Sequence, residues 1–436
     1  MKPNIQSRTV FLGDNLGFLR GINSECVDLI YADPPFNKKK EFTAPIGSAA
    51  EGAGFLDLFA KEDIKDEWVE EFRQENYELH SFLTGIKAIG NSYNYCYLVY
   101  MAIRIIECHR ILKNTGSFYL HCDHTMSHYL KMLLDCIFGE KQFRNEIVWE
   151  YDKFLSSRKK FFNKNNDVIL FYAKGRKNTF NTQFEDRQTT HSARGYVPQS
   201  FCNEIVIYEE TDKNRDKIQS YIDKGYKAKY VNFRGVPYAQ VWSIPKVGRS
   251  KESTGYPTQK PLALLERIVA ASSNKGDWVL DPFCGCVTTC IAAEKLQRHW
   301  AGIDVAEESW NQIERRLTTE VPPDLFRGAA NFSTTPPKRG KSDERPKKYV
   351  YVISNPAYPG MYKVGVAANA EARLNQFQTG DPKRRYQLEY KKMTPEYKTL
   401  EPYSHRQFDG DHEWVPGKLA DIVAAIKNYR PTHGEN

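Results

Sequence analysis

The positions of apolar residues along the chain predict strands that alternate with helices. Short apolar runs typical of buried strands cover residues 9–12, 27–32, 117–121, 168–172, 278–280 and 300–303. Helices are expected between them, for example over 97–112, where apolar residues recur every three or four positions, and over 261–273, which opens with a proline. Alternating strands and helices predict an α/β fold with a doubly wound, mostly parallel sheet.

Polar turns follow two of the predicted strands. Asp33-Pro34-Pro35-Phe36 follows 27–32, and Asp281-Pro282-Phe283-Cys284-Gly285 follows 278–280. Proline has no N–H and fixes its own φ, so the first turn offers rigid acceptors that can hold an amine. A glycine turn that opens into a helix offers backbone donors to the charged end of a cofactor. Two such turns predict one active site, for group transfer onto an amino group.

These turns resemble motifs of the beta class of DNA amino-methyltransferases. That family moves a methyl group from S-adenosylmethionine (AdoMet) to an exocyclic amine of adenine or cytosine. The resemblance covers residues 8–317 and also rests on Gly116-Ser117-Phe118-Tyr119-Leu120-His121, on Pro257-Thr258-Gln259-Lys260-Pro261 and on the order of the motifs. It implies a Rossmann-like AdoMet-dependent methyltransferase domain over 1–317, with an inserted target-recognition segment over about 151–250.

The resemblance also implies a substrate and a catalytic turn. The substrate would be double-stranded DNA, modified at adenine N6; cytosine N4 is the alternative, because Asp33 at the head of the motif favours adenine only statistically. Asp33 and the backbone of Pro34, in the turn completed by Pro35, would accept the N–H groups of the target, and Phe36 would stack on the flipped base. Asp14 resembles a family position near the target base, although it equally fits a helix N-cap.

The same comparison assigns residues to the cofactor. Asp304, 19 residues after Gly285, would bind ribose hydroxyls. Lys260 resembles an element near the amino-acid end of AdoMet, with a capping surface lysine as the alternative. Val287 stands where the commoner loop has its second glycine, so one close approach is expected to be lost. The cofactor-binding residues implied are Asp281, Phe283, Gly285, Thr288, Thr289, Asp304 and Lys260.

The C-terminal part resembles another family. Residues 318–347 are rich in proline with few apolar residues, which predicts a linker between the first domain and a module over 348–436. In that module Val350-Tyr351-Val352 and Lys363-Val364-Gly365 resemble the two triplets of GIY-YIG nucleases, which implies a small α+β domain. Tyr351 would then activate water, Arg373 steady the phosphate, Glu401 bind Mg²⁺ and His405 assist, with Lys363 replacing the second tyrosine.

A methyltransferase fused to a nuclease suggests restriction and modification in one chain. The alternative for the module is a DNA-binding domain with an inactive nuclease fold. The alternative for the whole chain is an inert DNA-binding protein, which the presence of both the AdoMet and the amine motifs disfavours. Transfer of tritium from labelled AdoMet to DNA separates an enzyme from a binder.

Composition adds the partners. Residues 151–250 hold 19 Lys and Arg against 10 Asp and Glu, so their net charge of 19 − 10 = +9 exceeds the +8 of the whole chain. This local excess of positive charge predicts contact with a phosphate backbone. Nine cysteines without paired spacing favour reduced thiols, and packing rather than a metal for Cys284, Cys286 and Cys290. No run of about 18 apolar residues and no secretory signal is present. We therefore expect a soluble cytoplasmic protein of a prokaryote or phage without a membrane partner; its oligomeric state is open, with a homodimer as one option.

Overall fold

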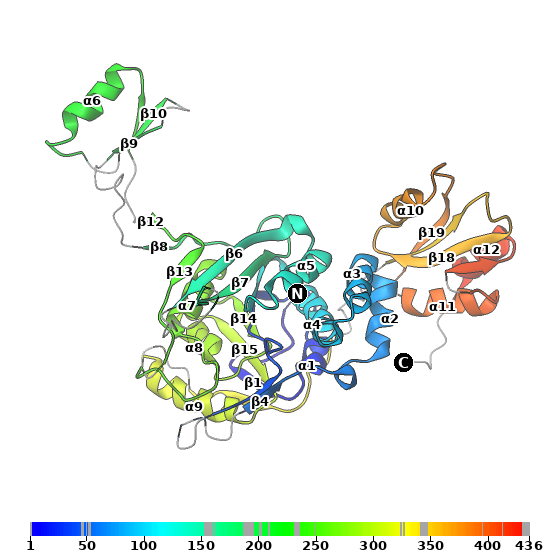
Figure 1. The fold of residues 1–436 in the computed structure, drawn as a ribbon, viewed down its shortest axis with the longest axis horizontal. Coiled ribbons are helices and arrows are strands. Elements are labelled where there is room, and N and C mark those ends of the chain that lie inside the picture. The colour runs from blue at the N-terminus through cyan, green and yellow to red at the C-terminus, as the bar shows by residue number, and fades with distance from the viewer. Residues whose placement is uncertain are drawn as a thin grey trace.

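The chain forms a large α/β domain, a projecting lobe and a small C-terminal domain (Figure 1). The computed structural model describes residues 2–44, 48, 50, 54–151, 160, 162–185, 196–199, 203–207, 210–230, 236–248, 250–322, 325, 328–340, 348–394, 396–411 and 413–429. Within these residues, no helix is long and apolar enough to cross a membrane.

The large domain is built on a mostly parallel sheet, as the sequence predicted. In the described residues β7 runs antiparallel to both of its neighbours, and every other strand pair of the sheet is parallel. The strands of this part of the chain lie in the order β13 (Val241–Ser243), β6 (Phe143–Glu150), β7 (Asn166–Ala173), β5 (Leu112–Cys122), β2 (Val27–Ala32), β14 (Trp278–Asp281), β15 (His299–Asp304), β1 (Thr9–Leu12) and β16 (Asn331–Ser333).

Helices cover both faces of this sheet. Successive residues of β2 point to opposite faces, so Ile30 joins one apolar cluster while Leu29 and Tyr31 join the other. The first cluster includes side chains of α1 (Asn15–Gly21), α2 (Asp66–Glu75), α3 (Tyr77–Ala88), α4 (Ser92–Ile111) and α5 (Ser127–Phe138). The second includes side chains of α7 (Leu262–Ser272), α8 (Thr288–Lys295) and α9 (Glu308–Glu320). The doubly wound arrangement is thereby confirmed.

A small lobe projects from the sheet between β7 and β13 (Figure 1). It consists of β9 (Tyr196–Gln199), β10 (Glu204–Ile207), β11 (Lys227–Tyr230) and α6 (Arg215–Asp223), and a short pair, β8 (Phe184–Glu185) and β12 (Val236–Pro237), lies at its base. Because β7 and β13 belong to the main sheet, only the middle of the predicted segment 151–250 is separate from that sheet. Of the 19 Lys and Arg residues of that segment, seven lie outside the described residues: Lys153, Arg158, Lys159, Arg187, Arg194, Arg234 and Arg249.

The first part of the predicted linker is folded onto the large domain. β16 pairs with β1, so residues 331–333 form an edge of the main sheet. Further along, Gly340 N donates to Asn23 Oδ1 (2.9 Å), and Arg339 Nη2 lies 3.3 Å from Glu107 Oε2. Residues 331–333, Arg339 and Gly340 of the predicted linker are therefore bound to the large domain.

The C-terminal domain is a small antiparallel sheet flanked by helices, which confirms the predicted α+β class. Its strands lie in the order β19 (Gln387–Thr394), β17 (Lys348–Ser354), β18 (Met361–Ala367) and β20 (Trp414–Pro416), with α10 (Ala370–Thr379), α11 (Tyr397–Gln407) and α12 (Leu419–Asn428). The domain lies beside α2 and α3 (Figure 1). Lys348 Nζ is 3.1 Å from Glu75 Oε2 on α2, and the Arg373 guanidinium lies 4.5 Å from the ring centroid of Tyr77.

Candidate active site

The two motif turns lie side by side because their strands are neighbours. β2 pairs with β14 in parallel, with Leu29 opposite Val279 and Ile30 opposite Leu280, so both strands end at one edge of the sheet. Asp33 and Asp281 face a common pocket there, with about 1070 Å³ of empty space, part of it open to solvent. Apart from Asp14, every predicted catalytic or cofactor residue of the large domain lines this pocket: Asp33, Pro34, Pro35, Phe36, Lys260, Asp281, Phe283, Gly285, Thr288, Thr289 and Asp304.

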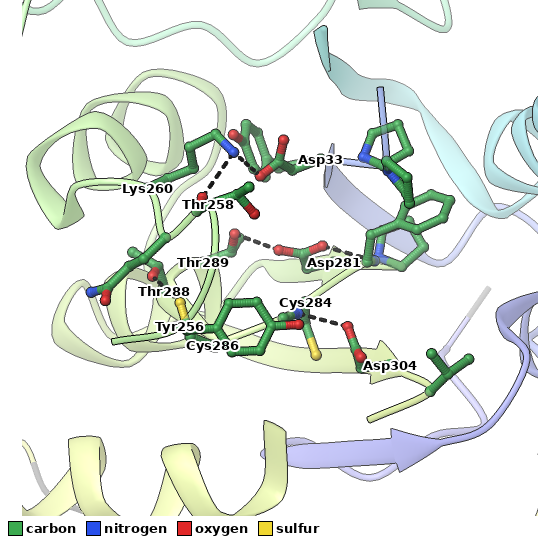
Figure 2. A pocket seen from close by; sticks show the side chains of 18 of the residues that line it. Asp33, Tyr256, Thr258, Lys260, Asp281, Cys284, Cys286, Thr288, Thr289 and Asp304 are labelled. Atoms are coloured by element: carbon green, nitrogen blue, oxygen red, sulfur yellow. Dashed lines mark hydrogen bonds and ion pairs between the residues drawn. The ribbon is translucent and has the colours of Figure 1, made fainter. Parts of the chain in front are cut away.

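Asp33 uses its two oxygens differently. Oδ2 accepts a hydrogen bond from Lys260 Nζ, which also donates to the carbonyl of Thr258 (3.1 Å; Figure 2). Oδ1 is buried and has no hydrogen-bond partner among the residues described. A buried carboxylate oxygen without a donor is costly, so the site supplies an acceptor that a ligand's N–H can satisfy. The sequence comparison had assigned Lys260 to the amino-acid end of AdoMet; here it lies on Asp33.

Asp57 holds the far end of the proline turn. The hairpin of β3 (Lys40–Thr43) and β4 (Gly54–Asp57) brings its carboxylate to the backbone N–H groups of Phe36 (3.2 Å) and Asn37 (2.5 Å). Burial raises the pKa of Asp57, and these hydrogen bonds oppose that rise. Sequence reasoning missed this residue, because no motif marks a carboxylate that supports a turn from a separate hairpin.

Two buried carboxylates shape the cofactor turn (Figure 2). Asp281 accepts from Thr289 Oγ1 (2.6 Å) and from the N–H of Phe283 (3.0 Å), and burial raises its pKa to about 7. Asp304, at the end of β15, accepts from the N–H of Gly285 (2.8 Å), and burial raises its pKa as well. Both side chains therefore fix the backbone of the loop between β14 and α8.

Two further residues constrain the loop, and the sequence did not identify either as a site residue. A Cβ on Gly285 would lie 3.1 Å from the ring of Tyr256, and the φ of +48° also favours glycine at this position. Arg316, buried on α9, donates to the carbonyl of Cys286 (2.6 Å) and to Thr288 Oγ1 (2.8 Å). Val287 adopts a left-handed conformation at φ +60°, which is uncommon for a β-branched residue. The loop thus keeps a glycine-like backbone without the second glycine.

The pocket suits a ligand that carries positive charge. Asp33, Asp281 and Asp304 place three carboxylates along it, and Thr288 and Thr289 open α8, where free N–H groups favour an anionic group. AdoMet carries a sulfonium and an ammonium group together with a carboxylate. The charges of the pocket therefore fit this cofactor.

Asp14 lies at the end of β1, beside the pocket. Its side chain caps α1 by accepting from the N–H of Leu16 (2.9 Å), and it also accepts from Nη2 of the buried Arg104 (2.5 Å). Gly13 and Asn15 line the pocket, whereas Asp14 is not among the lining residues. The structure thus contains the N-cap alternative, and the role near the target base stays a prediction.

In the C-terminal domain, two of the predicted residues bind a carboxylate that the sequence did not indicate, and one of them also contacts Tyr351. Glu413 accepts from Lys363 Nζ (2.8 Å) and from Arg373 Nη2 (3.0 Å), and Arg373 Nε donates to the hydroxyl of Tyr351 (3.3 Å). Burial raises the pKa of Tyr351 to about 12, although Arg373 opposes that rise. The phenol is therefore neutral near pH 7.

Glu401 and His405 form a separate pair on α11. His405 Nε2 lies 3.6 Å from a Glu401 carboxylate oxygen and 2.9 Å from the carbonyl of Val364, and burial raises the pKa of Glu401. In the part of the chain that the structure describes, no group of three or more His, Cys, Asp or Glu side chains could hold a metal ion. The expected Mg²⁺ therefore has no assembled ligand set among these residues.

Comparisons with known proteins agree with this architecture. The DNA methylase family model matches residues 27–315, about two thirds of the chain, so the chain belongs to this family. Methyl transfer to DNA from AdoMet is the activity of that family. A second model, the T5orf172 domain, matches residues 348–430. That match neither confirms nor excludes the predicted likeness to GIY-YIG nucleases, which stays a prediction.

Individual relatives are similar over most of the chain. The DNA adenine methyltransferase YhdJ of Escherichia coli (strain K12) is 31% identical over 314 residues, covering 72% of this chain and 83% of its own length. Type II methyltransferase M.HpaI of Haemophilus parainfluenzae is 25% identical over 387 residues, covering 88% and 92%. The solved PvuII DNA methyltransferase, described as cytosine-N4-specific, is 13% identical and aligns over 77% of this chain and 98% of its own, with a TM-score of 0.45.

Proposed function

We propose that this DNA methylase is site-specific and transfers the methyl group of AdoMet to N6 of adenine in duplex DNA. The observation that carries the proposal is the buried Oδ1 of Asp33, an acceptor without a donor beside a pocket that fits AdoMet. A flipped adenine presents an exocyclic NH₂ group that can donate there. The E. coli relative is named as a DNA adenine methyltransferase, which supports adenine over the alternative, cytosine N4.

The residues of the chain act by positioning the amine. AdoMet supplies an electrophilic methyl group when bound. Asp33 Oδ1 and the carbonyl of Pro34 accept the two N–H bonds of the target, which directs the nitrogen lone pair toward the methyl group. Phe36 lines the pocket next to Asp33 and offers a ring face for the base. Asp281 and Asp304 hold the loop against which the cofactor lies.

The experiment measures transfer and identifies the product. Purified protein receives tritiated AdoMet and genomic DNA, and DNA from expressing cells is sequenced for modified bases. N6-methyladenine at one recurring sequence is the expected result, and N4-methylcytosine would establish the alternative. Asp33→Ala should abolish transfer and keep AdoMet affinity, because Asp33 lies outside the cofactor loop. A variant that still methylates in single turnover contradicts the role given to Asp33.

Duplex DNA is the proposed partner of the lobe between β7 and β13. Every residue of β11 is exposed, including Lys227 and Lys229, and Lys224 precedes it. Cations on a projecting lobe can contact phosphates while the sheet edge holds the flipped base. Such a division of labour leaves recognition to the lobe and chemistry to the turns after β2 and β14.

Cleavage of unmethylated DNA is the second candidate function, assigned to residues 348–429. The observation that favours it is the pair of cations, Lys363 and Arg373, that holds the Glu413 carboxylate beside Tyr351. An anion held by two cations marks a place where a phosphate can bind instead. Together with methylation, this would be restriction and modification in one chain. A domain that binds DNA without cutting it is the alternative, and incubation of unmodified DNA with Mg²⁺ or Mn²⁺ decides between them.

A further inference from the structure

A buried histidine lies between two carboxylates directly behind the proline turn. His121, near the end of β5, has its Nδ1 3.8 Å from Asp33 Oδ1 and its Nε2 3.7 Å from Asp167 Oδ2. The Asp33 oxygen that faces this ring is the one without a hydrogen-bond partner among the described residues, and Nε2 of His121 is unpaired in the same sense. His121 therefore lies between Asp33, on the pocket wall, and Asp167.

The ring of His121 is held in place by its neighbours. Phe36 lies against it with a centroid distance of 5.6 Å, and Trp149 meets it edge-on at 5.5 Å. The hydroxyl of Tyr31 is 2.8 Å from Nδ1. His121 is fully buried, so water does not reach the ring directly. A polar ring kept at this place, with one nitrogen toward each carboxylate, suggests that it exchanges a proton with them.

The charges around the ring favour a neutral imidazole that can accept a proton. Burial lowers the pKa of His121, and Lys260 lowers it further, whereas Asp33 and Asp167 oppose both effects. Burial raises the pKa of Tyr31 well above its usual value, so its phenol is neutral and can donate to or accept from Nδ1. Lys260 stays bound to the other oxygen of Asp33. A proton on that carboxyl would lie close to this ammonium group, which favours passing the proton on to His121.

Methyl transfer to an amine must release a proton. The nitrogen lone pair forms the N–CH₃ bond, the C–S bond breaks with its electrons moving to sulfur, and the nitrogen becomes positively charged. We propose that His121 is the base that finally accepts this proton, with Asp33 as the carrier and Asp167 as the residue that stabilises the imidazolium. The amine gives its proton to Asp33 Oδ1, which passes it to Nδ1 of His121 and becomes a carboxylate again. This proposal rests on the proposed function.

Asp167 connects the ring to the surface. Its carboxylate accepts from the hydroxyl of Tyr151 (3.2 Å), and its side chain keeps 13% of its area exposed. Lys246 Nζ lies 3.7 Å from the ring centroid of Tyr151, on the same side of the site. The proton can therefore leave through Nε2 and Asp167 to solvent. Distances of 3.7–3.8 Å need to shorten for each transfer, as catalytic contacts often do when substrate binds.

The test compares His121→Asn and Asp167→Asn with a control variant, His109→Asn. His109 lies on α4, and burial lowers its pKa as well. Single-turnover methylation is measured from pH 5.5 to 8.5 at saturating AdoMet. In the wild-type protein the rate should fall at acidic pH, where a protonated ring cannot accept. His121→Asn should be about 10²–10³ times slower and lose this dependence, whereas His109→Asn should match the wild type.

A second readout does not depend on activity. The imidazole of His121, assigned by its disappearance in His121→Asn, is titrated by nuclear magnetic resonance in the protein without DNA. Asp167→Asn should lower the pKa of the ring further and slow transfer. If His121→Asn fails to bind AdoMet, the Asp167→Asn results decide. If His121→Asn and Asp167→Asn both keep wild-type rates and pH profiles while Asp33→Ala is inactive, the proposed proton transfer to His121 is wrong and the proposed function stands. If Asp33→Ala is active, the proposed function is wrong.

Discussion

Lys260 donates from its ammonium group to Oδ2 of Asp33, although 227 positions separate the two residues in the sequence. The contact links the turn after β2 to the segment that precedes α7. It places a fixed cation on one oxygen of the carboxylate and leaves the other oxygen for a ligand. Since both side chains are largely buried, neither charge is well screened by solvent.

Replacement of Lys260 by methionine should lower stability and the rate of transfer more than AdoMet affinity. The change leaves the Asp33 carboxylate without its cation. Because the pair borders an open pocket, water can solvate the carboxylate in part, and the free energy of unfolding should fall by about 1–3 kcal/mol. Denaturant unfolding and single-turnover kinetics measure the two effects. Lys295→Met, which breaks the half-buried pair with Glu266 at 2.6 Å, is the matched control. A loss confined to AdoMet affinity would favour the role suggested by the sequence comparison.

The affinity for AdoMet should depend on pH through Asp281. Burial raises the pKa of this carboxyl to about 7, so the free protein carries the proton below that pH. A cationic ligand favours the carboxylate, and binding must therefore release the proton. Affinity should fall as pH falls below 7, by up to about tenfold per pH unit. Calorimetry from pH 5.5 to 8 measures it; Asp281→Asn should flatten the profile, and S-adenosylhomocysteine, which lacks the sulfonium charge, should show a weaker dependence.

At Val287, glycine should be better tolerated than alanine. The left-handed backbone at φ +60° costs a non-glycine residue about 1–2 kcal/mol, and alanine retains that cost while losing most of the buried side chain. Val287→Gly should therefore be more stable than Val287→Ala by about 1 kcal/mol in urea unfolding. At Val279, on the extended strand β14, Val279→Ala should be more stable than Val279→Gly, because glycine has no advantage in an extended backbone. An alanine variant that is the more stable one at Val287 would contradict the observed backbone.

The elements that the sequence predicted well are those bounded by polar turns. Val27–Ala32 is apolar apart from Asp28 and is followed by Asp33, so the predicted and observed limits agree. α4 begins at Ser92, five residues before the predicted start, because Asn91 caps a first turn with little apolar periodicity. Leu112, the last residue of that predicted helix, is already the first residue of β5. β16 could not be predicted, since Asn331-Phe332-Ser333 has no pattern of its own and forms only on the edge that β1 offers.

The residues of the candidate site also fall into two groups, those that the sequence identified and those that it missed. Asp33 directly follows β2, and Asp281 and Asp304 end β14 and β15, so sequence motifs at strand ends identify them. Asp57 and Arg316 act on those turns from a hairpin and a helix that no local signal connects to the site. Asp57 and Arg316 reach the turns only because distant segments pack together, and that packing depends on side chains throughout the core.

Removing two lysines from the lobe should weaken DNA binding and its dependence on salt. Lys224 and Lys227 are exposed, and each phosphate contact that is lost should reduce the slope of log affinity against log salt by about 1. The double variant to glutamine is compared with the wild type by fluorescence anisotropy at several salt concentrations. The control is Lys65→Gln. Lys65 is the N-cap of α2, a helix that lies away from the lobe in Figure 1. Equal slopes for all three proteins would move the DNA contact elsewhere.

Methylation and any cleavage should separate at Arg373. This side chain connects Tyr351 with Glu413 in the C-terminal domain and touches none of the residues that line the methyl-transfer pocket. Arg373→Ala should abolish Mg²⁺-dependent cutting of unmethylated DNA, because the phosphate loses a cation, and should leave methyl transfer unchanged. Arg385→Ala, which removes the partner of Asp381 in the same domain, should retain both activities.

The matching test of independence is a protein ending at residue 347. It keeps the contacts that Arg339 and Gly340 make with the large domain, which an end at residue 335 would remove, and it should methylate DNA alone. A truncated protein that folds and binds AdoMet but does not methylate would show that the C-terminal domain contributes to target engagement. If the intact protein never cuts unmodified DNA with Mg²⁺ or Mn²⁺ while the target sequence is present, the domain is a binding module. In that case Lys363, which replaces the second tyrosine, is the first residue to restore.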